Sequence, residues 1–154
     1  MGEDANDAGG CFDILLGGWL GCGKGLSHDE GANRVVGAWY VYDSAAPFHQ
    51  HMYVFNADGT MQQANPDAGD SRTSDSDGKG IWVVGGSGVK GMWVEITANR
   101  VTHQFVGRGE YSYEIAVDKD SFTGKATMQF YDTHEARMGE PLRTTITGKR
   151  VTLP

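Results

Sequence analysis

The sequence predicts an all-β protein, an antiparallel up-and-down barrel of eight strands preceded by a glycine-rich segment. Glycine provides 23 of the 154 residues, about 15% where roughly 7% is usual. From Val35 to the C-terminus, short runs of alternating apolar and polar residues are separated by residues that tolerate positive φ. Connections this short leave no room for crossover helices, which excludes a parallel α/β fold and its dinucleotide sites.

The length of 154 residues suits a single domain. We divide the chain into a glycine-rich segment, residues 1–34, and a barrel domain, residues 35–154. Within the first segment, apolar positions such as Phe12 and Trp19 are compatible with a short cap over one end of the barrel and equally with a loosely attached tail.

Nine alternating runs are expected as strands, and one of them can merge with a neighbour. They are residues 35–42, 48–55, 60–64, 80–84, 89–97, 100–106, 110–117, 121–132 and 142–153. The connections between them include Asn56–Gly59, Gly85–Gly88 and Gly107–Gly109, which are typical of hairpins.

The alternation within these runs predicts which side chains face inward. In residues 121–132 the inner face is Phe122, Gly124, Ala126, Met128 and Phe130. Residues 110–117 would place Tyr111, Tyr113, Ile115 and Val117 inward, and residues 100–106 Val101, His103 and Phe105. A sheet with one dry face removes its exposed edges by closing into a barrel. The small residues Gly124 and Ala126 indicate a cavity inside it.

Two positions far apart in the sequence resemble a family signature. Gly37-x-Trp39 at the start of the first strand, with Arg150 near the end of the last, is similar to the signature of lipocalins and the wider calycin superfamily. The resemblance implies that Trp39 lies at the closed end of an eight-stranded barrel and that Arg150 stacks on it. It covers residues 35–153 in strand number and order. The chain has neither the disulfide nor the helix that follow the barrel in secreted lipocalins, and allene oxide cyclase-like barrels share the same outline.

The charge distribution excludes several partners. The net charge is -7, and the 12 acidic and 4 basic residues before Gly80 carry the excess. Because basic residues are not clustered, we expect no binding to nucleic acid or to anionic membranes. No apolar run approaches the roughly 20 residues of a membrane span. The acidic N-terminus and the two cysteines, Cys11 and Cys22, favour a soluble cytoplasmic chain with reduced thiols.

Five side chains are candidates for proton transfer. His49, His51 and Tyr53 share one strand face, which either points into the barrel or, because the opposite face is more apolar, into solvent. A metal site would need a third ligand such as His103, and we expect no metal. His103 is otherwise a satisfied core histidine or an acid–base group. Glu95 points with Trp93 and is a candidate acid only if that face lines the lumen.

A larger apolar set either lines a ligand pocket or fills the barrel, since small eight-stranded barrels do both. It consists of Trp39, Phe55, Trp82, Phe105, Tyr111, Tyr113, Phe122, Met128 and Phe130.

Residues 65–79 form a polar connection without a large apolar side chain. Long unstructured connections of this kind are usually functional or disordered, and we expect a lid at the open rim, with Gly69 and Gly78 as hinges. An idle solvated loop is the alternative. Its acidic residues lack the ligand spacing of an EF-hand, so calcium is not expected.

These features predict a barrel that encloses a small, largely hydrophobic or amphipathic molecule. The alternative function is a cyclase, isomerase or dehydratase that needs no cofactor and acts on a polyketide- or terpenoid-like substrate through shape and His, Tyr or Glu side chains. A third possibility is an interaction domain with a filled core. A homodimer is left open.

Overall fold

The computed structural model describes residues 34–86 and 88–154, and the expectations for the N-terminal segment lie outside this part of the chain. Nine strands follow one another: β1 (Gly37–Asp43), β2 (Gln50–Phe55), β3 (Thr60–Ala64), β4 (Thr73–Asp75), β5 (Gly78–Gly85), β6 (Gly88–Asn99), β7 (Phe105–Asp118), β8 (Ser121–Asp132) and β9 (Arg137–Arg150). Among the described residues, no helix has the length and apolar character needed to cross a membrane.

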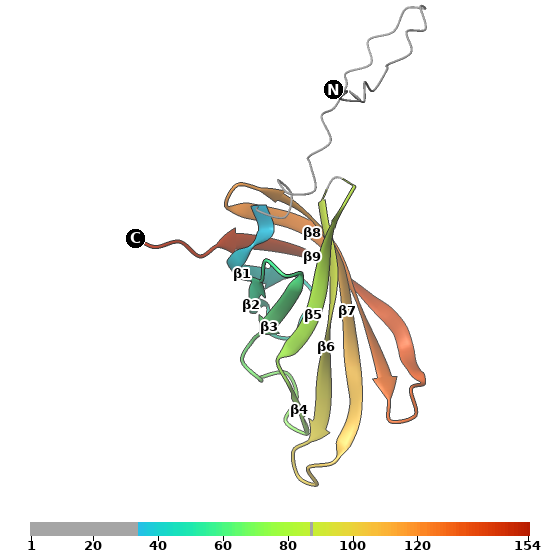
Figure 1. The fold of residues 1–154 in the computed structure, drawn as a ribbon. Helices are drawn as coiled ribbons and strands as arrows, with labels where there is room; N and C mark the ends of the chain where they lie inside the picture. Colours follow the sequence, from blue (N-terminus) through green and yellow to red (C-terminus); the bar gives the residue numbers. More distant parts are fainter. Residues whose placement is uncertain (1–33, 87) are drawn as a thin grey trace, which may run out of the picture.

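The strands close into an antiparallel eight-stranded barrel, as the sequence predicts (Figure 1). The ring runs β1, β2, β3, β5, β6, β7, β8 and β9, and β9 pairs with β1. The short strand β4 pairs with the end of β6, where Asp75 lies opposite Thr97, beyond the part of β6 that pairs with β5. β4 therefore takes the place of β5 as the neighbour of the last residues of β6.

A dense aromatic core fills the half of the barrel where β1 begins. Trp39 and Phe122 are completely or almost completely buried, with ring centroids 5.2 Å apart. The guanidinium carbon of Arg150 lies 4.2 Å from the Trp39 ring centroid, which confirms the contact that the resemblance implies. Arg150 also donates to the Val36 carbonyl at 2.8 Å and pairs with Asp120 at 3.1 Å. Arg150 thus joins the first and last strands of the ring.

Residues 100–106 do not form a strand of their own, which corrects the sequence prediction: residues 100–104 form a turn, and Phe105 and Val106 belong to β7. Asn99 Oδ1 accepts the backbone N–H groups of Val101 and Thr102, both at 2.9 Å, and His103 has a positive φ of 57°. These side-chain bonds replace the strand ladder with a turn. β7 begins at Phe105, and Val101 and Phe105 are exposed instead of facing inward.

Further differences from the prediction concern the connection of residues 65–79 and the last strand. The connection of residues 65–79 contains β4, because the backbone of Thr73–Asp75 pairs with β6. The last strand begins at Arg137 instead of residue 142 and ends at Arg150. A register shift opposite Met128 and Phe130 accommodates the extra residues of β9.

The small inner residues of β8 do not border an empty lumen. A Cβ on Gly124 would lie 2.6 Å from Ile115 Cγ2, so the isoleucine opposite occupies that space. Ala126 is 5% exposed within the same core. The cavity instead lies nearer the other end of β8.

Candidate functional site

A pocket of about 170 Å³ opens at the end of the barrel where β1 stops and β2 starts. Its walls come from β1, β2, β6, β7, β8 and β9 and from the connections after β1 and β3. The largest apolar side chains that line it are Pro47, Phe48, Trp93, Met128, Phe130 and Leu142. It is the mouth of the barrel, above the packed core.

Asp43, the last residue of β1, organises one side of the pocket. Its Oδ1 accepts the backbone N–H groups of Ala45 at 3.0 Å and Ala46 at 3.2 Å. Thr144 Oγ1 donates to the same oxygen at 2.5 Å, and the Tyr111 hydroxyl donates to Oδ2 at 2.5 Å. This carboxyl group, 3% exposed, holds the turn after β1 against β7 and β9.

A stacked aromatic pair forms another part of the wall. The rings of Trp93 and Tyr111 lie 4.6 Å apart at an interplanar angle of 9°. Trp93 Nε1 donates to the Tyr53 hydroxyl at 3.4 Å. Burial is the largest cause that raises the pKa of Tyr111, and the neighbouring Tyr53 adds to it. Both tyrosines therefore stay neutral hydrogen-bonding groups at ordinary pH.

His51 is the one strongly buried imidazole in the described part of the chain, at 8% exposed, and it lines the pocket. Burial lowers its pKa, which outweighs the opposite effects of the Asp43 carboxylate and the Phe48 carbonyl. Its Nδ1 lies 2.9 Å from Gln63 Nε2. Its Nε2 is buried and has no hydrogen-bond partner within the described residues.

Gln63 determines which nitrogen of His51 carries the proton. Gln63 Oε1 accepts the backbone N–H of Gly78 at 2.9 Å, so its Nε2 is the group that faces His51. An amide NH₂ only donates. His51 Nδ1 must therefore accept, and the neutral ring carries its hydrogen on Nε2. A Cβ on Gly78 would lie 2.9 Å from Gln63 Oε1, so glycine permits this close approach.

Glu95 brings a second titratable group to the same pocket. It follows Trp93 by two residues on β6, is partly buried and lines the pocket. Burial raises its pKa to about 7, and the negative charge of Asp75 contributes in the same direction. A Cβ on Gly109 would lie 3.1 Å from Glu95 Oε1, so β7 passes close to the carboxyl group.

The pocket is acidic. Asp43, Asp67, Asp75 and Glu95 line it, and no lysine or arginine is among the described residues of its lining. The nearest cationic contact recorded for these carboxylates is Arg100, whose Nη2 lies 2.7 Å from Asp67 Oδ2. A negative, largely apolar cavity disfavours anionic guests, since like charges repel strongly where water is excluded.

The connection between β3 and β5 lies at this pocket, as expected for a segment at the open rim. Its lining members are Asn65, Pro66, Asp67, Ala68, Gly69 and Asp75. Arg100 donates from Nε to the Asp70 carbonyl at 3.1 Å, and Asp67 accepts from Ser74 at 2.6 Å. The segment is tied to the turn after β6.

The candidate proton-transfer residues separate in the structure. His51 and Glu95 line the pocket, and Tyr53 is buried beside it. His49 is exposed, with Nδ1 2.8 Å from the Asp43 carbonyl. His103 is exposed in the turn after β6.

The candidate ligand-contact residues separate in the same way. Tyr111, Met128 and Phe130 line the pocket. Phe105 is 48% exposed, and the rest belong to the core: Trp39, Phe55, Trp82, Tyr113 and Phe122.

The sequence analysis did not identify Asp43 or Gln63 as site residues. It mentioned Trp93 only as the residue that shares a strand face with Glu95. Asp43 directly follows the first predicted run, residues 35–42, at a position typical of a turn residue. Gln63 sits two residues after the buried Met61, so its inward position follows from strand alternation. A buried glutamine in such a position is a signal of a polar network.

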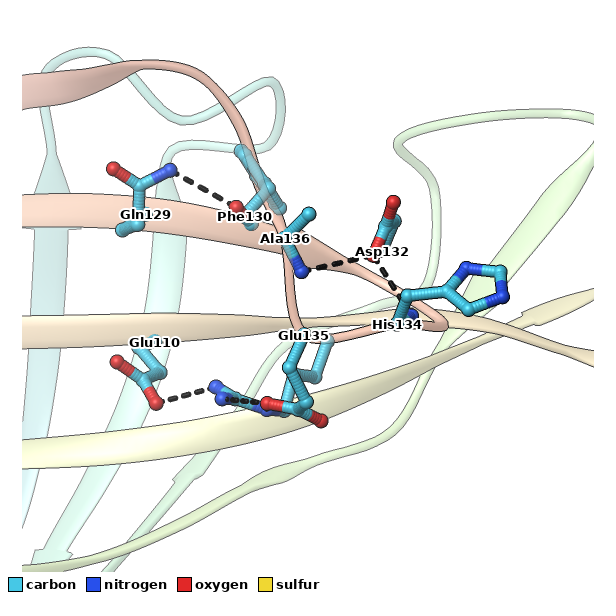
Figure 2. A network of polar contacts seen from close by, with 8 residues as sticks. Glu110, Gln129, Phe130, Asp132, His134, Glu135 and Ala136 are labelled. Carbon is cyan, nitrogen blue, oxygen red and sulfur yellow. Dashed lines mark hydrogen bonds and ion pairs between the residues drawn. The ribbon is translucent and has the colours of Figure 1, made fainter.

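A polar network on the outer side fixes the part of β8 and β9 that carries Phe130 and Leu142 (Figure 2). Asp132 Oδ1 accepts the backbone N–H groups of His134 at 2.8 Å and Ala136 at 2.9 Å, which closes the turn between the two strands. Arg108 on β7 forms ion pairs with Glu110 and with Glu135 of this turn. These contacts on the outer side therefore stabilise the ends of β8 and β9 next to the pocket.

No three His, Cys, Asp or Glu side chains gather as a metal site within residues 34–86 and 88–154. Comparison of the chain with protein-family models, with curated proteins and with solved structures found no match.

Proposed function

We propose that this barrel binds a small, largely apolar molecule in the pocket at the open end. The observation that supports this most is the contrast between the two halves of the barrel: one is filled by aromatic side chains, and the other keeps a pocket of about 170 Å³. A cavity of roughly 150 Å³ is large enough for a benzene-sized ring. The Gly37-x-Trp39 and Arg150 contact supports a place among lipocalin-like barrels as part of the same proposal.

The test is a thermal-shift screen of small organic molecules with a pair of matched tryptophan variants. Ala46→Trp puts a bulky ring at the pocket, whereas Ala116→Trp puts the same ring on the exposed outer face of β7. Ligands that bind the pocket raise the melting temperature of the native chain and of Ala116→Trp, and lose this effect in Ala46→Trp. Ligands that stabilise all three proteins equally would contradict the proposal.

A second function is favoured by the presence of both His51 and Glu95 in the lining of one pocket. Perturbed titratable groups in a cleft are typical of acid–base catalysis. In an isomerase of this kind the Glu95 carboxylate takes a proton from the carbon beside a carbonyl group, and the resulting carboxylic acid returns it to another carbon. The proton is conserved, and the reaction consumes no co-reactant.

This second function is tested by hydrogen exchange. A ketone incubated with the protein in D₂O exchanges the hydrogens beside its carbonyl, and NMR measures the rate. We expect Glu95→Gln to abolish the acceleration, while Glu114→Gln, a change on the outer face, leaves it unchanged. A Glu95→Gln protein that still accelerates exchange would exclude this role for Glu95.

A further inference from the structure

We infer that the pocket selects a neutral molecule with a carbonyl oxygen that accepts a hydrogen bond from His51 Nε2–H, and that it rejects carboxylates. The inference rests on the proposed binding function and specifies its ligand class.

The first step is the fixed orientation of the His51 proton. Three hydrogen bonds determine the Gln63 amide: from Gly78 N to Oε1 at 2.9 Å, and from Nε2 to Asn65 Oδ1 at 2.7 Å and to His51 Nδ1 at 2.9 Å. Nδ1 is occupied as an acceptor, so the other ring nitrogen of this pocket-lining residue is a donor and not an acceptor.

The second step is the missing partner of that donor. His51 Nε2 is buried and makes no hydrogen bond to any described residue. The Phe48 carbonyl lies near the ring, yet no hydrogen bond of normal geometry joins them. A buried N–H without an acceptor destabilises the unliganded protein. A ligand oxygen at the ring edge would remove this cost.

The third step is the charge of the acceptor. The oxygens of Asp43 already accept four hydrogen bonds, and Glu95 stands in the same lining. No cation among the described lining residues offsets them. A ligand carboxylate would enter without a partner for its charge, whereas a ketone, ester or lactone brings an acceptor without a charge.

The fourth step is the shape of the remaining surface. Large apolar side chains form much of the remaining lining, namely Trp93, Met128, Phe130 and Leu142. An aromatic or cyclic body with one carbonyl group matches this arrangement.

The experiment titrates three probes of similar size, acetophenone, benzoate and ethylbenzene, into the full chain labelled with ¹³C at the methionine methyl groups. Met128 lines the pocket, and Met52, on the outer face of β2, is the internal control. We expect acetophenone to shift the Met128 signal with an affinity about tenfold higher than benzoate and about fivefold higher than ethylbenzene. In His51→Phe, which removes the Nε2–H donor and also the Nδ1 acceptor of Gln63, the advantage over ethylbenzene should disappear.

Equal affinity for the three probes at Met128 would overturn the inference and leave the binding function standing. No shift at Met128 with any probe would overturn both. The tautomer is tested on the unchanged protein by ¹⁵N spectra of the histidine rings, so a His51→Phe protein that fails to fold does not block the test. We expect His51 to carry hydrogen on Nε2, and a ring with hydrogen on Nδ1 would overturn the inference.

Discussion

Burial of Glu95 links the pocket to pH. A carboxyl group whose pKa is about 7 in the folded chain and near 4.5 when unfolded binds its proton more tightly in the folded state. The folded state therefore loses stability as the pH rises from about 4.5 through about 7. His51 acts in the opposite direction: its pKa is lowered, so its contribution is lost as the pH falls below 6.5.

Glu95→Gln separates the two effects because it removes only the carboxyl group. We expect the variant to be more stable than the native chain at pH 8, by about 2 kcal/mol, and the difference to shrink towards pH 5. Urea unfolding at several pH values measures it. Glu114→Gln, at an exposed pair with Lys90, should give a difference that does not vary in this way. A difference for Glu95→Gln that is equally flat would contradict the burial of an uncharged Glu95.

Strand alternation alone could not decide which face of residues 48–55 points inward. His51 and Tyr53 lie on one face and Met52 and Val54 on the other, so both faces mix apolar and polar character. The pairing of His51 with the buried Val41 decides the matter, because paired residues share a face. His51 then enters the barrel and Met52 is left 39% exposed.

The turn after β6 shows where sequence patterns mislead. Val101, His103 and Phe105 have the spacing of a strand face, and nothing in the alternation excludes one. The Asn99 side chain decides the structure, since it caps the two N–H groups that a strand would use in its ladder. The strands β3 and β8, whose runs end in strong turn residues, have the predicted bounds.

The segment between β3 and β5 is held at the pocket by Arg100. We expect Arg100→Met to raise ligand association and dissociation rates several-fold, because it removes the Asp67 ion pair and the bond to the Asp70 carbonyl. Stability should fall by less than about 1 kcal/mol, as for other exposed pairs. Stopped-flow binding measures both rates. Arg72→Met, which breaks the exposed pair with Asp70, is the control, and equal rates in the two variants would make the segment a bystander.

Strands β5 and β6 approach closely at Gly80. A Cβ there would lie 1.9 Å from the Met92 carbonyl oxygen and 2.6 Å from Trp93 Cα, so backbone atoms would have to move. We expect Gly80→Ala to reduce the free energy of unfolding by at least about 2 kcal/mol. Gly85→Ala, on the same strand with open space around it, is the matched control. Similar small losses in both variants would show that the strands separate more readily than this packing allows.

Closure of the barrel depends on the contact between its first and last strands. Arg150 covers Trp39 and donates to the Val36 carbonyl, so its loss removes a cation–π contact and leaves a carbonyl without its donor. We expect Arg150→Ala to lower the free energy of unfolding by about 2–4 kcal/mol. Arg143→Ala, at an exposed position of the same strand, should change it by less than about 0.5 kcal/mol. Equal effects in denaturant unfolding would contradict the role of Arg150 in closure.

The division of the barrel into a packed half and an open half was only partly accessible from the sequence. The resemblance carried by Trp39 and Arg150 predicted the closed end, which is the packed half. The position of the cavity did not follow from the small residues Gly124 and Ala126, because the side chain of Ile115 occupies the space at Gly124 and Ala126 is buried in the packed core. Such filling depends on cross-strand pairs that only the three-dimensional register reveals.

A crystal structure of the full chain soaked with 4-bromoacetophenone tests most directly whether the open half holds the ligand. The anomalous signal of bromine locates the molecule independently of its shape. We expect one site between Trp93 and Met128, with the ketone oxygen within hydrogen-bond distance of His51 Nε2. Bromine found only on the outer surface, or inside the packed half beside Phe122, would contradict a ligand site at the open end of the barrel.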